Sequence, residues 1–416
     1  MNNGQQNNGN MKKEKKHSLP KGWEIKKLGE VANVGSGNSA PQNKKLFENG
    51  IFPFFRTSDV GQIRKGFIGT SVNYLNENGI KSLKLFQKGT ILLPKSGAST
   101  FLNHRVMMLV DGYVSSHLAT IKAMSKIVDD KFLLYYLITI DAKDLIQNIA
   151  YPSLKISEIE LIPIPLPPLS EQRRIVSILD KCFSAIEQSR NNAEQNLKNA
   201  KEIFNCVLDS ILYDKKWEIE RLGNVCKKIE YGTSSKAQTK GELPVLRMGN
   251  IQNGRFVWDN LVYSNNKDDN KKYLLKHNDV LFNRTNSPEL VGKTAIYKSE
   301  KPAIFAGYLI RIHRKEDLLD ADYLNYYLNS KMAFEYGKTV VISSVNQANI
   351  NGTKLKTYPI PLPSLKEQQA IVHKLDALRI ETQKLESIYQ KKILLLEELK
   401  KSILQKAFNG ELIMDN

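Results

Sequence analysis

Two long stretches of the chain carry apolar residues at alternating steps of four and three positions. This spacing predicts two long α-helices that each present an apolar seam, as the helices of a coiled coil do. Within residues 163–211, the helix after the proline-rich start would be roughly 60 Å long, which is too long for the core of one ordinary domain. Polar Ser189 and Asn196 interrupt the first seam. The predicted seam positions include Ile175, Leu179, Ile186, Val207, Ile371, Leu375, Leu385, Leu396, Leu399 and Ile403.

A proline-rich segment precedes each predicted helix. Each proline fixes its own φ and disfavours helix at the residue before it, so these segments are expected to be extended. Ser170 offers a side-chain cap for the first helix, although Arg173 stands where a capping box would have Glu. We therefore expect the first helix to begin at about Ser170.

The same segment occurs twice, which reveals a tandem duplication. PIPLPPLSEQRRIVSILD (residues 163–180) and PIPLPSLKEQQAIVHKLD (residues 359–376) are identical at 12 of 18 positions. A second pairing matches WEIKKLGEV (residues 23–31) with WEIERLGNV (residues 217–225). The repeated unit is a globular block followed by a long helix.

Each globular block contains short apolar runs separated by Gly, Asn and Ser, which predicts short strands in an α+β domain. In the first block these runs are IFPFF, TILLP and VMMLV, and residues 131–149 are expected to be helical. In the second block LPVLRMG, DVLFNRT and AGYLIRIHR are the expected strands, and DYLNYYLNSKMAFEYG is the expected helix. Matching the blocks pairs Arg56 with Arg247, Lys95 with Arg284, His117 with Tyr308, and Leu154 with Ile350.

The predicted domain boundaries follow from the repeats. The predicted segments are a disordered basic tail (1–18), a first globular domain (19–162), a proline turn with a central helix (163–213), a second globular domain (214–358), and a second proline turn with a helix (359–412). Two blocks that share apolar positions but differ in polar loop residues are expected to have one fold and to recognise two different ligands.

The positive charge is concentrated in the globular blocks. The chain has a formal net charge of +18; residues 20–169 carry +6 (18 basic, 12 acidic) and residues 216–363 carry +8 (23 basic, 15 acidic). The helical stretches 170–215 and 364–416 carry 0 and +1. The distribution favours two blocks that face a polyanion, with neutral helices that pack on protein, although an ordinary basic surface is the alternative interpretation.

The sequence argues against several classes of protein. Three cysteines form no metal-binding spacing and no disulfide framework, and the six histidines show no ligand pattern. No apolar run approaches membrane-span length, so a cytoplasmic protein without a membrane segment is expected. SPELVGKT (residues 287–294) resembles a P-loop but has Ser287 in place of the leading Gly, and a strand is expected after it instead of a helix. It is interpreted as a structural turn.

The duplicated P-L-P-x-L-x-E-Q segments resemble those of the specificity subunits of type I restriction–modification systems. The two block starts, the LVGKTAIY segment (residues 290–297) and KKSILQKAFNGEL (residues 400–412) carry the same resemblance, which covers about residues 19–412. The resemblance implies two target-recognition domains, each reading half of a split sequence on double-stranded DNA. It also implies that the two long helices pair as an antiparallel coiled coil that separates the domains.

The resemblance further implies that the chain is not itself catalytic. It would direct adenine methylation and restriction by its partners, which are two copies of an adenine methyltransferase subunit and restriction/translocase subunits. S-adenosylmethionine, ATP and Mg²⁺ would belong to those partners. A stand-alone basic DNA-binding protein is the main alternative, and a stand-alone nuclease or methyltransferase is disfavoured because no catalytic motif was found.

Residues that follow strand ends are the predicted DNA contacts, because Arg and Lys suit guanine and Asn suits adenine in the major groove. For each, a solvated surface side chain or a phosphate contact without sequence information is the alternative. The predicted DNA-binding residues are Arg56, Thr57, Ser58, Lys95, Ser96 and Arg105 in the first block, and Arg247, Asn250, Arg284, Thr285, Asn286 and Lys293 in the second.

Overall fold

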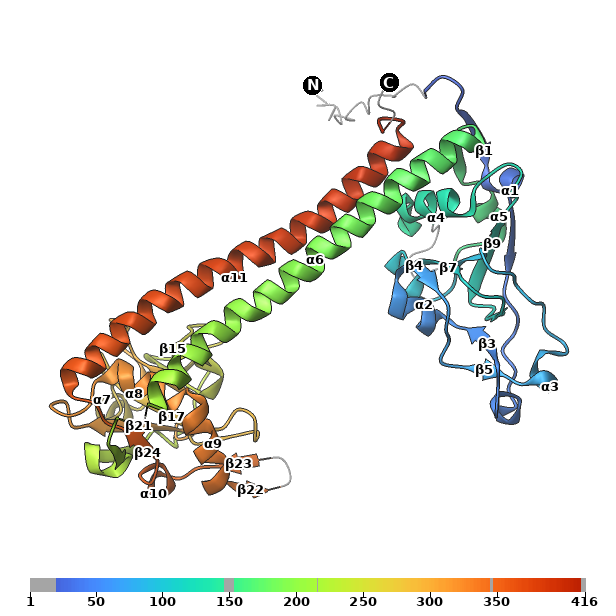
Figure 1. Ribbon diagram of the computed structural model, residues 1–416. Coiled ribbons are helices and arrows are strands. Elements are labelled where there is room, and N and C mark those ends of the chain that lie inside the picture. Colours follow the sequence, from blue (N-terminus) through green and yellow to red (C-terminus); the bar gives the residue numbers. More distant parts are fainter. Residues whose placement is uncertain (1–19, 146–152, 215, 345–346, 413–416) are drawn as a thin grey trace, which may run out of the picture. The chain divides into compact units, whose positions relative to one another are not determined.

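The computed structural model describes residues 20–145, 153–214, 216–344 and 347–412. The chain divides into two compact units, which are described separately. The first unit contains residues 1–191 and 393–416, and the second contains residues 192–392. Each unit therefore consists of a globular block of strands and short helices together with part of each long helix (Figure 1). The predicted tail, residues 1–18, lies outside the described residues.

Apolar runs of the first block become buried strands. Its main sheet has the order β2-β9-β6-β7-β4, in which only β4 and β7 are parallel. A smaller sheet, β5-β3-β8, places β3 and β8 parallel. IFPFF, TILLP and VMMLV lie in β3, β6 and β7, as predicted. The strands are β2 (Ala32–Ser36), β3 (Phe52–Phe55), β4 (Lys65–Ile68), β5 (Tyr74–Leu75), β6 (Ile91–Pro94), β7 (Arg105–Met108), β8 (Tyr113–Val114) and β9 (Leu118–Ala123).

The second block repeats this arrangement with its own additions. Its main sheet has the order β12-β21-β17-β19, and β16-β13-β20 forms the smaller sheet with β13 and β20 parallel. A hairpin (β14-β15) and a third small sheet (β18-β23-β22) are added. The strands are β12 (Cys226–Tyr231), β13 (Leu243–Leu246), β14 (Ile251–Gln252), β15 (Arg255–Phe256), β16 (Val262–Ser264), β17 (Val280–Asn283), β18 (Thr285–Asn286), β19 (Thr294–Ile296), β20 (Ile304–Phe305), β21 (Leu309–Arg314), β22 (Ile342–Ser344) and β23 (Gln347–Asn349).

Equivalent backbone hydrogen bonds confirm the predicted pairing of the blocks. The Lys95 amide donates to the His117 carbonyl at 3.0 Å, and the Arg284 amide donates to the Tyr308 carbonyl at 3.0 Å. Leu154 donates to Lys95 at 2.8 Å, and Ile350 donates to Arg284 at 2.8 Å. The P-loop-like segment leads into strand β19, so its interpretation as a structural turn is also confirmed.

The short helices pack on these sheets and on the block ends. In the first unit they are α1 (Leu28–Val31), η1 (Lys44–Phe47), α2 (Thr57–Ile63), α3 (Glu77–Ile80), η2 (Ala98–Leu102), α4 (Asp130–Thr139), η3 (Ala142–Asp144) and α5 (Ile156–Glu160). In the second unit they are η4 (Leu222–Val225), η5 (Met248–Asn250), α7 (Lys267–Lys272), α8 (Ala321–Leu328), α9 (Lys331–Val340) and α10 (Gly352–Leu355).

Two helix predictions are wrong in extent. The helix expected over residues 131–149 ends at Thr139 and is followed by η3, while residues 146–149 lie outside the described residues. The helix expected in DYLNYYLNSKMAFEYG is divided into α8 and α9. Ser330 causes the division, because its hydroxyl accepts a hydrogen bond from the Ala333 amide and caps a new helix.

The proline-rich segments pair with the repeated block starts. Strand β1 (Glu24–Lys27) pairs antiparallel with β10 (Pro163–Leu166), and β11 (Ile219–Arg221) pairs in the same way with β24 (Pro359–Pro361). Proline has no amide hydrogen, and two-stranded ribbons leave one edge of each strand unpaired, so the prolines are tolerated there. This pairing joins the start of each block to the start of the helix that follows it.

The long helices are α6 (Leu169–Leu212) and α11 (Leu365–Phe408), each 44 residues. The predicted cap at Ser170 is wrong, because α6 begins at Leu169 and Ser170 lies within its first turn. In the second copy, Ser364 holds the position before the helix. Its amide donates to the Glu367 carboxylate at 3.0 Å, and the Glu367 amide donates to the Ser364 hydroxyl at 3.4 Å. The capping box therefore exists in one copy only.

The two long helices pack against each other in opposite directions. In the first unit, Ile175 and Leu179 of α6 share a core with Leu404 and Phe408 near the end of α11. In the second unit, Leu208 and Leu212 at the end of α6 share a core that includes Leu375 near the start of α11. The predicted antiparallel pairing is confirmed, and the helices are seen side by side in Figure 1.

Most of the predicted seam faces inward, but two positions do not. Ile175, Leu179, Ile186 and Leu375 are buried, and Val207, Ile371, Leu396 and Ile403 are half-buried. Leu385 and Leu399 are exposed, so their assignment to the seam is wrong. A helix of 3.6 residues per turn drifts away from a strict seven-residue repeat. Beside Leu399 the inward position is held by Lys400, whose ammonium lies 5.1 Å from the centroid of the Phe183 ring.

A buried glutamine near the start of each long helix ties the helix to its block; we call each of these sites a glutamine clamp. The side chain of Gln172 accepts from the Asp129 amide at 2.8 Å and donates to the carbonyls of Ile127 (3.1 Å) and Pro167 (2.8 Å). Because Asp129 caps α4, the clamp joins the starts of α4 and α6.

The second copy contains the same clamp. Gln368 accepts from the Asp320 amide and donates to the carbonyls of Leu318 and Pro363, all at 2.8 Å. Asp320 caps α8, which is the counterpart of α4. Both glutamines are fully buried. The Gln of the repeated E-Q motif therefore joins the long helix to the globular block in each unit.

Candidate nucleic-acid interface

The ends of the strands bring several predicted DNA-contact residues of the first unit to one edge. Strands β3 and β8 are parallel, so Arg56 and Ser115 follow them at the same edge, where the Ser115 amide donates to the Phe55 carbonyl at 2.9 Å. Lys95 follows β6 and bonds to His117 through the backbone. The Ser96 hydroxyl and the His117 Nδ1 atom lie 2.8 Å apart. We call this surface the first strand-end edge.

The second unit has a matching edge with different side chains; we call it the second strand-end edge. The Ala306 amide donates to the Leu246 carbonyl at 3.0 Å, which places the residues after β20 next to Arg247. The Arg284 guanidinium donates to the Gly307 carbonyl at 3.3 Å and lies 4.9 Å from the centroid of the Tyr231 ring. The Arg284 amide also donates to the carbonyl of Tyr308, whose side chain is exposed.

A groove of about 650 Å³ adjoins the second strand-end edge and brings four predicted residues together. Arg247, Asn250, Asn286 and Lys293 all line it. Arg247 is exposed, whereas Asn286 and Lys293 are half-buried. The groove therefore combines two cations and several amides with the exposed carboxylate of Asp259 and apolar side chains.

Three predicted contact residues are buried, which removes them from the candidates for base contact. The Thr285 hydroxyl accepts a hydrogen bond from the side-chain amide of Asn349 at 2.7 Å. The Asn250 side chain accepts from the Arg247 amide and donates to the carbonyls of Val257 and Asp259, so it braces the loop. Burial of the Arg105 guanidinium, which donates to the His104 carbonyl at 2.8 Å, lowers its pKa to about 10.

The residues that follow β3 are only partly available for contact with DNA. The Arg56 guanidinium lies 5.5 Å from the ring centroids of both Phe47 and Phe54, so aromatic packing restrains it. Thr57 is half-buried in the first turn of α2, while Ser58 is exposed. Among the predicted residues of the first unit, Ser58, Lys95 and Ser96 are therefore better placed for contact than Arg105.

Sequence reasoning missed the residues that hold these contacts in position. Tyr231 comes from β12 and supports Arg284, although the two are far apart in the chain. The Asn260 carbonyl accepts a hydrogen bond from the Arg247 guanidinium at 2.9 Å. No spacing in the sequence signals either contact. The pairing of His117 with Tyr308 was the one available signal, since it placed an aromatic or imidazole ring at the equivalent position of both edges.

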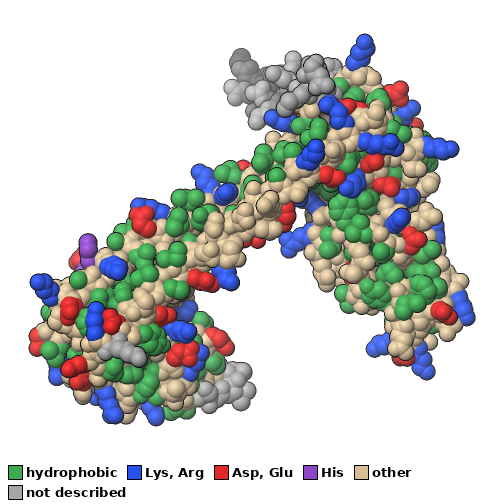
Figure 2. Space-filling model, viewed as in Figure 1, with side chains coloured by type: hydrophobic (Ala, Val, Ile, Leu, Met, Phe, Trp, Pro, Cys, Tyr) green, Lys and Arg blue, Asp and Glu red, His purple; other side chains and the backbone are tan. Residues whose placement is uncertain are grey.

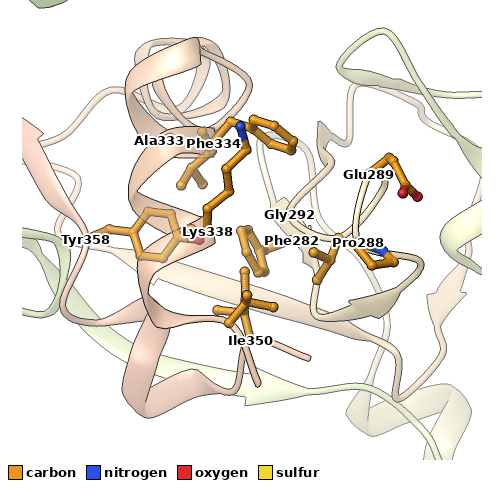
Figure 3. Close-up of a pocket in the computed structure, with 13 residues that line it drawn as sticks. Phe282, Pro288, Glu289, Gly292, Ala333, Phe334, Lys338, Ile350 and Tyr358 are labelled. Atoms are coloured by element: carbon orange, nitrogen blue, oxygen red, sulfur yellow. The ribbon is translucent and has the colours of Figure 1, made fainter. Parts of the chain in front are cut away.

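A cavity of about 500 Å³ lies on another part of the second unit, beside α9 (Figure 3). Phe334 and Lys338 of α9 face Pro288 and Glu289 of the loop before β19 across it. Its walls are mainly apolar, and none of the predicted DNA-contact residues lines it. It offers few of the donors and acceptors that base edges require.

Charge is distributed over both units instead of being confined to one patch. On the visible face of Figure 2, Lys and Arg side chains are dispersed over both globular blocks with Asp and Glu among them. In the second unit, part of the positive charge is neutralised internally, because Arg311 pairs with Glu230 at 2.6 Å and with Asp279 at 2.9 Å. The candidate interface is therefore defined by the strand-end edges and the groove.

The family model for the type I restriction modification DNA specificity domain matches the chain twice, over residues 20–195 and 214–394. The chain belongs to this family. Each match contains one globular block and a large part of the long helix that follows it. The duplication found in the sequence is thus a duplication of the specificity domain.

Relatives match along nearly the whole chain. The Escherichia coli K12 type I restriction enzyme EcoKI specificity subunit is 23% identical over 95% of this chain and 90% of its own length. The Methanocaldococcus jannaschii MjaVIII specificity subunit is 24% identical over 96% and 95%. The solved HsdS subunit from Thermoanaerobacter tengcongensis is similar in fold, with a TM-score of 0.60, 22% identity and coverage of 96% and 100%.

A second solved structure, from work on complex assembly of the type I R-M system, gives a TM-score of 0.74 at 22% identity over 95% of this chain and 100% of that chain. These likenesses confirm the predicted fold. The family match, together with relatives that are specificity subunits, confirms the predicted role, which is that of a DNA-specificity subunit of a type I restriction–modification system.

Within the described part of the chain, no helix combines the length and the apolar character needed to cross a bilayer. Over the same residues, His, Cys, Asp and Glu do not gather in groups of three or more that could hold a metal ion.

Proposed function

We propose that this chain reads the two halves of a split target on double-stranded DNA, one half with each unit. The observation that carries the proposal is the difference between the two strand-end edges. Lys95 and His117 occupy the places that Arg284 and Tyr308 occupy in the second unit. A shared backbone with different donors and acceptors is what reading two different short sequences requires.

The proposed partners are two adenine methyltransferase subunits and restriction/translocase subunits. S-adenosylmethionine, ATP and Mg²⁺ would be bound by those subunits. The chain would contribute DNA recognition and a surface for assembly, and it would thereby direct adenine methylation and restriction to one target. DNA and the other subunits of a type I system are partners of specificity subunits in general, whereas this stoichiometry is part of the proposal.

The outer side of α11 is the proposed assembly surface for a methyltransferase subunit. In the first unit, Leu394, Leu395 and Leu399 are 66%, 50% and 47% exposed. Their side chains point away from the inward positions that pack against α6. Leu395 and Leu399 are four residues apart and therefore neighbours on the helix surface. Large exposed apolar side chains in such a group are typical of a protein-binding surface.

Methyladenine mapping tests the function directly. Genomes of the source strain with and without the gene are compared by long-read sequencing. We expect one split motif, two short halves around a fixed gap, to lose methylation when the gene is deleted. Restoring the gene with Leu395→Lys and Leu399→Lys should leave the motif unmethylated, whereas the exposed control Ser402→Lys should restore it.

Two outcomes would contradict the proposed function. Unchanged methylation in cells that are shown to express the chain and its partners would overturn the role in methylation. Binding by the purified complex that depends on salt but does not distinguish sequences would instead support a general DNA-binding protein.

A further inference from the structure

The groove beside the second strand-end edge contains hydrogen-bond donors that the protein does not use. Arg247 is exposed, and its guanidinium is held to the groove wall by one bond to the Asn260 carbonyl at 2.9 Å. This single bond fixes the direction of the side chain while leaving most of its five N–H donors open. Arg247 is therefore oriented before any ligand binds.

Two further donors face the same groove. Asn286 accepts a hydrogen bond from the Ser287 amide at 2.9 Å through its side-chain oxygen. Among the described residues, no acceptor bonds to the amide nitrogen of Asn286 or to the ammonium of Lys293. Both side chains are half-buried, so part of each stays accessible and its donors can bond to the acceptors of a ligand.

The groove is stiff and has apolar borders. Buried Asn250 bonds to the carbonyls of Val257 (3.2 Å) and Asp259 (2.9 Å) and accepts from the Arg247 amide, so two segments of the wall are tied together. Met248 and Leu290 line the groove and are each 38% exposed. Rigid placement of donors between apolar contacts suits base edges, which present acceptors beside the thymine methyl group.

Resting on the proposed function, we infer that this groove is where the second unit reads bases. Arg247 and Lys293 would donate to the O6 and N7 atoms of guanines, and Asn286 would donate to the N7 atom of an adenine. Met248 and Leu290 would contact thymine methyl groups or sugars. Asn250 is a positioning residue that holds Arg247 in place without contacting DNA.

The equivalent place in the first unit is constructed differently. Asp59 takes the position of Asn250, where it accepts from the Arg56 amide at 2.7 Å and from the Val72 amide at 2.9 Å. Arg56 is packed on two phenylalanine rings instead of being held to a loop carbonyl. Changes in the groove of the second unit should therefore alter one half of the target only.

The test uses the whole chain expressed with its cognate methyltransferase subunits in cells that lack other adenine methylation. The wild-type motif is mapped first, followed by Arg247→Ala, Asn286→Ala and Lys293→Met. Each variant should relax one base position in the same half-site, with a loss of preference of about 5- to 150-fold at that position. The other half-site should be unchanged. Arg221→Gln, an exposed cation on β11 outside the groove, is the control and should leave both halves unchanged.

A variant that abolishes methylation is tested as a purified complex on oligonucleotides substituted one base at a time. Loss of discrimination at one position of the second unit's half-site supports the inference, and full discrimination with weaker binding to every sequence overturns it. Uniform weakening with a smaller salt dependence would identify phosphate contacts instead. If the wild-type chain directs no split motif, the proposed function fails. If the wild-type motif is present and no groove variant alters it, only the groove assignment fails.

Discussion

Gln368→Leu should destabilise the second unit far more than any change on the surface of α11. The leucine is similar in size, but it removes three hydrogen bonds of 2.8 Å at a site with no solvent exposure. The Asp320 amide and the carbonyls of Leu318 and Pro363 lose these bonds at the same time. An unsatisfied buried group costs about 1–3 kcal/mol, so we expect the free energy of unfolding to fall by about 3–5 kcal/mol after partial relaxation.

The tryptophans allow this loss to be assigned to one unit. Trp23 lies in the first unit, and Trp217 and Trp258 lie in the second. In a Trp23→Phe background, urea unfolding followed by tryptophan fluorescence reports the second unit, and Gln368→Leu should move that transition to lower urea. Gln369→Leu is the matched control, because Gln369 is exposed and adjacent, and it should change stability by less than about 0.5 kcal/mol.

Two results would refute this reasoning. A loss of less than about 1 kcal/mol would mean that water or local rearrangement satisfies the three backbone groups. An equal loss in Gln369→Leu would mean that the helix start is sensitive to any apolar residue. In a Trp217→Phe, Trp258→Phe background, where Trp23 reports the first unit, Gln172→Leu should shift the transition in the same direction, because its clamp has the same three kinds of partner.

Two other changes should have predictable effects. Phe408→Ala removes a buried ring whose centroid lies 5.2 Å from that of Phe132, so the first unit should lose about 3–5 kcal/mol of stability. Urea unfolding followed by Trp23 fluorescence in a Trp217→Phe, Trp258→Phe background measures this loss, and a loss seen only for the second unit, in the Trp23→Phe background, would contradict the assignment of this core. Burial opposes ionisation of Glu230, but hydrogen bonds from His313 and Arg311 outweigh it and lower its pKa to about 2. The second unit should therefore keep this stabilisation above the ordinary pKa of about 4.5 and lose it as the pH falls toward 2; urea midpoints between pH 5 and pH 3 measure the loss, and Glu230→Gln should flatten this dependence.

Local patterns in the sequence were sufficient for the duplication, the long helices and most strands. Short apolar runs such as TILLP form strands that are buried on both faces. Matching these runs between the two blocks correctly paired Lys95 with Arg284. The division between α8 and α9 was missed because the apolar pattern continues across Ser330, and only the capping bond reveals the break. Leu399 is turned out of the seam because of how the two helices pack against each other. The sequence of one helix does not determine that packing.

The predicted DNA contacts stay predictions, and the structure shows only which of them lie together. Arg247, Asn286 and Lys293, which were selected because they lie near strand ends, line one groove. The rule that contacts follow strand ends could not show that Asn250 turns inward, because its partners Val257 and Asp259 belong to a loop with no regular pattern. The clamp was equally hidden, since Gln172 bonds to residues 43 and 45 positions away.

The first unit is discontinuous in sequence, which has a consequence for synthesis on the ribosome. Its core contains Leu404, Ala407 and Phe408, so residues 20–191 cannot complete that core when they emerge. The intervening 192–392 segment takes about 10–40 s to translate at ordinary rates. When that interval ends, the second unit has all of its own residues, whereas the first unit still lacks residues 393–416. The order of maturation is therefore inverted, and any chain terminated before residue 404 leaves its N-terminal unit unfinished and exposed to proteolysis.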